Sequence, residues 1–139
     1  ATENREKRGE GKPETFDFLG FTYRQGYSQR LKRNVRVKFP RAKSMKAVRL
    51  RIKEVIKSFP LGSPLREVIG QVNRTLRGWA GYFRIGNSYA AALSLSNYVC
   101  DQLRLFWRRR KHRKGIRGSR HWPSGFFYDQ GVHYVPSLL

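Results

Sequence analysis

An apolar stripe with helical spacing runs through residues 65–83 and limits what this chain can fold into. At about 100° per residue, its apolar side chains fall within one arc of roughly 100°, as on a helix that packs against a core. Similar stripes occupy residues 45–59 and 92–106. The stripe residues are Met45, Val48, Ile52, Val55, Ile56 and Phe59, then Leu65, Val68, Ile69, Val72, Leu76, Trp79 and Phe83, then Ala92, Leu95, Val99, Leu103 and Phe106. The three stripes predict a mainly α protein built on a three-helix bundle.

Capping and breaking residues set the expected ends of these helices. Serine and asparagine often cap a helix N-terminus, whereas glycine and proline end or precede a helix. The helices are therefore expected at about 44–58, 64–84 and 88–113, within a domain at residues 41–113. The residues that support these ends are Ser44, the segment FPLGSP at 59–64, Gly86, Asn87 and Ser88.

Period-two alternation before the helices predicts a β-hairpin over residues 16–40. FDFLGFTY (16–23) and VRVKF (35–39) each alternate apolar and polar side chains, and Pro40 ends the second run. The polar segment at residues 1–15 contains nothing that could anchor it to a core. It is expected to be a disordered linker.

Residues 114–139 are expected to form an irregular tail that is rich in basic and aromatic side chains. Glycine and proline residues interrupt the helical pattern there. Within the tail, FFYDQGVHYV (126–135) predicts a small hairpin that turns at Asp129-Gln130-Gly131.

Net charge is the strongest functional constraint. Thirty Lys and Arg residues oppose nine Asp and Glu, which gives +21 and a pI near 11.2. Five of the nine acids lie in the first 17 residues, so the remainder is more basic still. A surface that repels itself in this way favours a polyanion, above all nucleic acid, as partner. No long apolar span, signal-like segment or lipidation motif favours a membrane instead.

Cys100 is the only cysteine in the sequence, so an internal disulfide is excluded and a reducing compartment fits. We therefore expect an intracellular protein, in the bacterial cytoplasm or an organelle, rather than a secreted one. Cys100, His112, His121 and His133 lack the close ligand pairs of structural zinc sites. No metal or other cofactor bound by this chain is expected.

Basic residues form rows along one flank of each predicted helix, with few acids among them. Like charges three or four residues apart cost roughly a few tenths of a kcal/mol per pair, and a bound polyanion would relieve that cost. The rows, which include one asparagine, are the predicted RNA contacts: Lys46, Arg49, Lys53 and Lys57; Arg66, Asn73, Arg77 and Arg84; Arg104, Arg108 and Lys111. The third row continues into the basic run 108–111. A row can also be an ordinary solvated face, which leaves the role of any single residue open.

LRGWAGYFRIGNS (76–88) contains aromatic side chains that either stack on bases or belong to the core. Trp79 and Phe83 continue the apolar stripe and are expected to be buried. The candidates for base stacking are Tyr82, at the edge of the stripe, and Trp122 and Tyr134 in the tail. For the two tail residues, local packing is the alternative.

Acidic residues that could hold catalytic metal ions are not grouped in the sequence. Two-metal phosphoryl transfer needs clustered carboxylates, and only Glu54, Glu67, Asp101 and Asp129 follow residue 17. No Walker loop, dinucleotide motif or zinc-protease helix is present. We therefore expect this chain alone to have no polymerase or nuclease activity.

FDFLGFTY (16–23) and LRGWAGYFRIGNS (76–88) resemble the C-terminal part of group II intron-encoded reverse transcriptases, which are also called maturases. The resemblance spans about residues 16–113. It implies that the three helices are the thumb, or domain X, the maturase-specific domain. It also implies a primer grip, at the edge of the polymerase palm, formed by Phe18, Leu19, Gly20 and Phe21.

The resemblance further implies that the partner is structured intron RNA, which the domain binds to promote splicing. In the full polymerase, this domain flanks the template–primer duplex, with the palm and fingers upstream, and Mg²⁺ is expected only with the RNA or that parent enzyme. Gly81 stands where the family often has Asn, and the Tyr-x-Asp-Asp motif of the palm and a Cys-rich endonuclease extension are absent. The chain therefore resembles a C-terminal fragment without the polymerase site.

Two other functions remain open from the residues alone. A structural RNA-binding protein of ribosomal type would need only the basic rows. A duplex-DNA-binding module would place one helix in the major groove. Preference for structured RNA over matched duplex DNA separates a maturase domain from the DNA-binding module.

Overall fold

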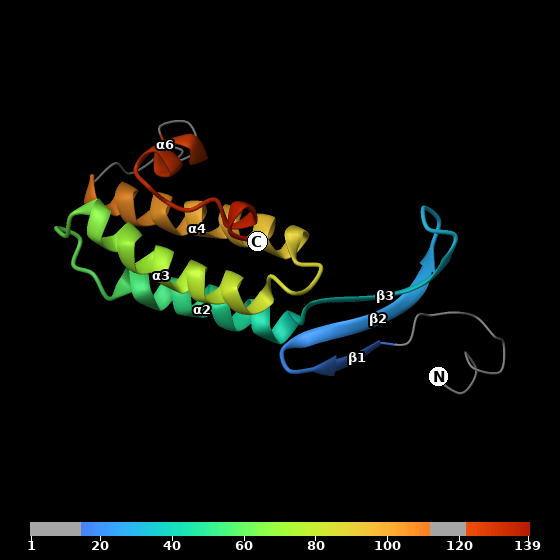
Figure 1. Cartoon of the computed structure of the whole chain (residues 1–139). Coiled ribbons are helices and arrows are strands. Elements are labelled where there is room, and N and C mark those ends of the chain that lie inside the picture. The colour runs from blue at the N-terminus through green and yellow to red at the C-terminus, as the bar shows by residue number, and fades with distance from the viewer. Residues whose placement is uncertain (1–14, 112–121) are drawn as a thin grey trace.

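The computed structural model describes residues 15–111 and 122–139, which form a helical bundle and a β-sheet that projects from one end of it (Figure 1). The predicted linker at 1–15 lies outside the described residues except for Thr15. In chain order the elements are β1 (Thr15–Phe18), β2 (Phe21–Ser28), β3 (Arg33–Pro40), α2 (Ala42–Lys57), α3 (Leu65–Phe83), α4 (Tyr89–Arg110), α6 (Ser124–Asp129) and the 3-10 helix η1 (Val135–Leu138). The expected class, a mainly α protein with a β-hairpin before three helices, is confirmed.

The apolar stripes of α2, α3 and α4 meet in one core, as their helical spacing predicts. Ile52, Leu76 and Leu95 have no exposed surface, and they come from the three different helices. Trp79 and Phe83 are 6% and 7% exposed, so the prediction that these aromatics are core is confirmed. Their rings stack on each other with centroids 5.2 Å apart.

The C-terminal segment is part of this core and contains no hairpin, so the hairpin predicted at 126–135 is wrong. Phe127 and Val135 are fully buried. Gly131, with φ +105°, ends α6 instead of turning a hairpin. The amide of Val132 donates to the carbonyl of Phe127 at 3.1 Å, as in the Schellman motif that closes many helices. An Asp-Gln-Gly sequence fits both a hairpin turn and the end of a helix. Here the helix is formed, and it buries Phe127 in the core.

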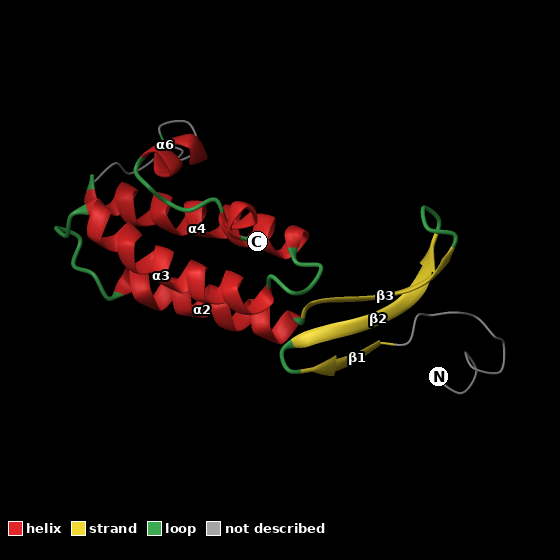
Figure 2. Cartoon of the chain, in the orientation of Figure 1, coloured by secondary structure: helices red, strands yellow, loops and turns green. Residues whose placement is uncertain are grey.

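The sheet has three antiparallel strands in the order β1-β2-β3, drawn in yellow in Figure 2. FDFLGFTY, predicted as one strand, is divided by a turn at Leu19 and Gly20. Both residues have positive φ, +52° and +85°, as a two-residue type I′ hairpin requires. The predicted pairing of 16–23 with 35–39 is otherwise found, because Tyr23 lies opposite Lys38.

Helix α2 begins at Ala42, two residues before the predicted cap, and no side chain caps it. Ser44 instead donates its hydroxyl to the carbonyl of Gly20 at 3.0 Å. The amide of Arg41 donates to the same carbonyl at 2.9 Å. The serine therefore fastens the β1–β2 turn to the bundle.

The loop between α3 and α4 receives the other side of the sheet. A Cβ on Gly86 would lie 2.7 Å from Cε1 of Phe21 and 3.0 Å from the carbonyl oxygen of Lys38, so only glycine fits. The backbone N–H of Asn87 donates to that carbonyl at 2.7 Å. Its side-chain Oδ1 accepts the backbone N–H of Lys38 at 3.3 Å. Asn87 thus joins the sheet to the bundle, and Ser88 donates its hydroxyl to the carbonyl of Phe83 rather than capping α4.

Candidate nucleic-acid interface

Three long helices leave three grooves between them, and the C-terminal segment fills one. Helix η1 packs against both α3 and α4. The amide of Val135 donates to Ser96 of α4 at 2.8 Å. Asn73 of α3 donates to the carbonyl of Gly131 at 2.9 Å and accepts the amide of His133 at 3.0 Å. The α2/α3 and α2/α4 grooves remain open to solvent.

The α2/α4 groove brings the predicted row of α2 together with a cation from α4. Lys53, Lys57 and Arg109 line it, above an apolar floor that includes Phe106. Lys46 and Arg49 continue the same flank of α2 at helical spacing. Burial raises the pKa of Tyr98 on α4, and the charge of Arg49 acts in the opposite direction, which places Arg49 near α4. We call Lys46, Arg49, Lys53, Lys57 and Arg109 the α2/α4 basic face.

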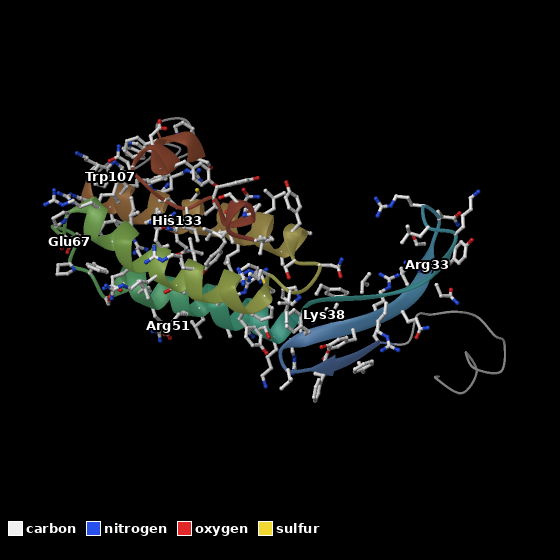
Figure 3. All side chains as sticks on the ribbon, in the orientation of Figure 1. Arg33, Lys38, Arg51, Glu67, Trp107 and His133 are labelled. Atoms are coloured by element: carbon white, nitrogen blue, oxygen red, sulfur yellow. The ribbon has the colours of Figure 1, made fainter. Side chains whose placement is uncertain are left out.

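The row of α3 lies on a different side of the bundle, next to the C-terminal segment. Nη1 of Arg77 is 3.0 Å from Nε2 of His133. Figure 3 labels that histidine beside α3 and α4. Arg66 and Arg84 are exposed. The rows of α2 and α3 therefore face different neighbours in the bundle, and RNA contact stays a prediction for both.

Asn73, predicted as an RNA contact, is an internal link. It is 7% exposed, and both ends of its amide bond to the C-terminal segment. These two hydrogen bonds use Oδ1 and one N–H of Nδ2, and burial keeps the side chain away from the surface where a phosphate would bind. The sequence places Asn73 among arginines because it shares their helical flank, and only the position of residues 131–133 shows its role.

The row of α4 is also partly used within the protein. Arg104 donates to the carbonyl of Trp122 at 2.8 Å, to Asp101 at 2.6 Å and to Ser124 at 3.1 Å. Its side chain is 15% exposed, so Arg104 holds the C-terminal segment on α4 and is not a free phosphate contact. Nζ of Lys111 lies 4.7 Å from the ring centroid of Trp107, and Arg108 is half-buried.

The α2/α3 groove, about 810 Å³ in volume, contains two cations that do not belong to the predicted rows. Arg51 of α2 and Arg74 of α3 line it together with small side chains such as Ala47 and Gly78. Within residues 15–111 and 122–139, neither arginine forms an ion pair. Arg51 lies on the flank of α2 opposite the predicted row, whereas Arg74 lies on the outer face of α3 and also borders a hollow shared with Arg77. Each is a single cation on its helix, so no row in the sequence marked them.

The predicted primer grip forms one end of this α2/α3 groove. Leu19 and Gly20 line the groove; the side chain of Leu19 is 66% exposed. Phe18 is 57% exposed, whereas Phe21 is 2% exposed and packs on Phe83 with centroids 4.9 Å apart. The four residues therefore divide into an exposed turn and a buried anchor.

The three candidates for base stacking differ in how much of each ring already packs against other side chains. Tyr82 is 49% exposed, stacks on Phe21 at 5.7 Å and donates its hydroxyl to the carbonyl of Leu19. Tyr134 is 40% exposed and meets Tyr128 edge-on at 5.7 Å. Trp122 is half-buried at the start of the described C-terminal segment. Base stacking stays a prediction for all three.

Two further findings concern the described part of the chain. Within it, no three His, Cys, Asp or Glu side chains come together as a metal site would need. No described helix is long and apolar enough to cross a bilayer.

The geometry defines a basic three-helix domain with an attached three-stranded sheet, residues 15–40, which we call the β arm. Residues 45–123 match the family model of the group II intron, maturase-specific domain. That match covers more than half of the chain, and the protein belongs to this family, as the two motifs suggested. No curated protein matches the chain. Membership supports a role in group II intron splicing and implies intron RNA as the partner.

Proposed function

We propose that this domain binds structured intron RNA directly, through the α2/α4 basic face, and thereby helps the intron reach its splicing-competent fold. One observation carries the proposal: Lys53, Lys57 and Arg109 converge on one open groove whose described lining contains no carboxylate. Three cations on two rigid helices match closely spaced phosphates. Phosphate contacts of this kind supply affinity and register.

The chemistry of a folded intron explains why such a face would help. Folding brings phosphates close together, and a rigid basic surface offsets their repulsion alongside the Mg²⁺ that accompanies the RNA. The helices that carry these cations are fixed by a packed core, so the backbone needs little reordering when RNA binds. This chain then acts by binding alone, without polymerase or nuclease activity, in the compartment where the intron is transcribed.

In a full-length parent polymerase, the α2/α3 groove would flank the template–primer duplex. Arg51 and Arg74 would take backbone phosphates, and the exposed turn at Leu19-Gly20 would meet the primer end. Small side chains along the groove permit the close approach that a duplex needs. The palm and fingers would lie upstream of the β arm.

The test is a salt titration of RNA binding by the whole chain. Replacing Lys53 and Lys57 together by Gln removes two phosphate contacts, so the slope of log affinity against log salt should become shallower by about two. Affinity should fall for all structured RNAs alike. Matched duplex DNA serves as competitor, since weaker DNA binding distinguishes this function from a DNA-binding module.

The double variant Arg77→Gln with Arg84→Gln is the matched control, because it removes the same charge from the other row. It should change the slope by less than the α2 pair does. A larger effect from the α3 pair would move the binding face to α3. Unchanged binding in the α2 pair would refute the α2/α4 basic face as the RNA site.

A further inference from the structure

The outer half of the β arm has no protein partner among the described residues. The described part of β1 begins at Thr15, which lies opposite Arg24. Among the described residues, only β2 and β3 continue beyond that point, as a two-stranded ribbon over residues 25–36 that extends away from the bundle (Figure 1). No side chain in this ribbon is buried. Figure 3 labels Arg33 at its far tip.

The ribbon carries positive charge on both of its faces. Residues two apart in a strand share a face, so Arg33 and Arg36, three apart, lie on opposite faces. Arg24 is paired with Val37 and therefore shares the face of Arg33. All three arginines are exposed, and none forms an ion pair within the described residues. The sequence contains no acid between residues 18 and 53.

Charge on both faces indicates the shape of the partner. A flat anionic surface would contact only one face of the ribbon and leave the positive charge on the other face without an anionic partner. A groove walled by two phosphate backbones contacts both faces at once. A two-stranded ribbon is marginally stable in water, so a projecting one with unpaired charge gains most from such an enclosure.

We propose that ribbon 25–36 inserts into a groove of the intron RNA where its helix is widened by unpaired nucleotides. The choice of RNA rests on the proposed function; the insertion does not. A regular A-form major groove is too narrow for side chains, whereas the wider groove of B-form DNA admits a two-stranded ribbon. An RNA helix therefore needs a bulge or internal loop to accept this ribbon. Tyr27, 58% exposed, is placed to stack on an unpaired base.

The experiment compares two hairpin RNAs that differ only in a central three-nucleotide bulge. Wild-type protein should bind the bulged RNA more tightly. Arg33→Gln with Arg36→Gln should weaken that binding by about 25-fold at 0.15 M salt, from the loss of two phosphate contacts. It should also abolish the preference for the bulge. Lys53→Gln with Lys57→Gln should weaken both RNAs equally and keep the preference.

Each other outcome contradicts at least one of the two proposals. Equal weakening of both RNAs by the ribbon variant, or none, overturns the insertion and leaves the α2/α4 basic face standing. A larger loss on duplex DNA than on bulged RNA overturns RNA as the occupant. No binding of either RNA by the wild type overturns both proposals.

A second variant separates binding from folding. Replacing residues 25–36 by Asn-Gly joins Arg24 to Val37 through a two-residue hairpin. Because nothing in that segment is buried, thermal unfolding of the helices should be unchanged, while the bulge preference disappears. Retention of the preference by this shortened chain would overturn the insertion.

Discussion

The helical bundle and the β arm are both strongly basic, but only the bundle has a hydrophobic core. Leu76, Leu95 and Phe127 are fully buried within the bundle and the segment that packs on it. In the strands, only Phe21 and Pro40 are buried, and both lie where the arm meets the bundle. Positive charge is therefore carried by two regions that differ greatly in how much hydrophobic core supports them.

The difference predicts how each region should bind. Cations on the bundle keep their positions before RNA arrives, because the core fixes the helices that bear them. Cations on the arm depend on strand pairing and on the joint at its base. Binding through the arm should include a cost for ordering it, whereas binding through the bundle should not.

The largest effect is expected in the bundle, at Trp79. Replacing it by Ala should lower the free energy of unfolding by about 3–5 kcal/mol, as large-to-small changes in a core do. Trp79→Phe should cost much less, because the phenyl ring keeps the stack on Phe83. It also removes a buried indole Nε1 that has no hydrogen-bond partner among the described residues. Urea unfolding measures both.

Equal losses in Trp79→Ala and Trp79→Phe would mean that the indole nitrogen has a bonding role. Unchanged stability in Trp79→Ala would contradict the core itself. Either result would weaken the contrast between the two regions.

Helical periodicity predicts the bundle well because each stripe reports directly on burial. The three helices and the burial of Trp79 follow from spacing alone. The turn at Leu19-Gly20 was not predicted, because the short run 16–23 also fits a single strand, although its alternation changes phase between Phe18 and Phe21. The C-terminal segment was missed for a similar reason, because one buried phenylalanine at Phe127 outweighs a sequence that also fits a hairpin.

The candidate site was predicted less completely than the fold. Spacing shows which residues share a flank of one helix but not which neighbour that flank faces. Arg104 and Asn73 therefore resembled RNA contacts until the position of the C-terminal segment was known. The ribbon cations were passed over because the predicted strands were 16–23 and 35–39, which left Arg33 in the connecting loop, whereas β3 begins at Arg33.

A smaller effect is expected at Asn73, which ties the C-terminal segment to α3. Asn73→Ala leaves the carbonyl of Gly131 and the amide of His133 without their partner. The free energy of unfolding should fall by about 2 kcal/mol, since buried groups lose their hydrogen bonds. RNA affinity at fixed salt should stay the same, because Asn73 is buried.

Asn97→Ala is the control for Asn73. This asparagine is exposed on α4, and its loss should change stability by less than about 0.5 kcal/mol. If Asn73→Ala weakened RNA binding without affecting stability, its role as an internal link would be wrong.

The smallest effect is expected at the joint, where Tyr82 donates its hydroxyl to the carbonyl of Leu19. Tyr82→Phe should lower global stability by no more than about 1 kcal/mol, because the ring is half-exposed and its packing remains. The local consequence should be clearer: amide exchange should quicken at the β1–β2 turn and stay constant in α3. Tyr27→Phe, on the same arm but away from the joint, should change neither rate. Faster exchange throughout α3 in Tyr82→Phe would show that the arm and the bundle unfold as one unit, and the contrast between a self-supporting bundle and a dependent arm would then fail.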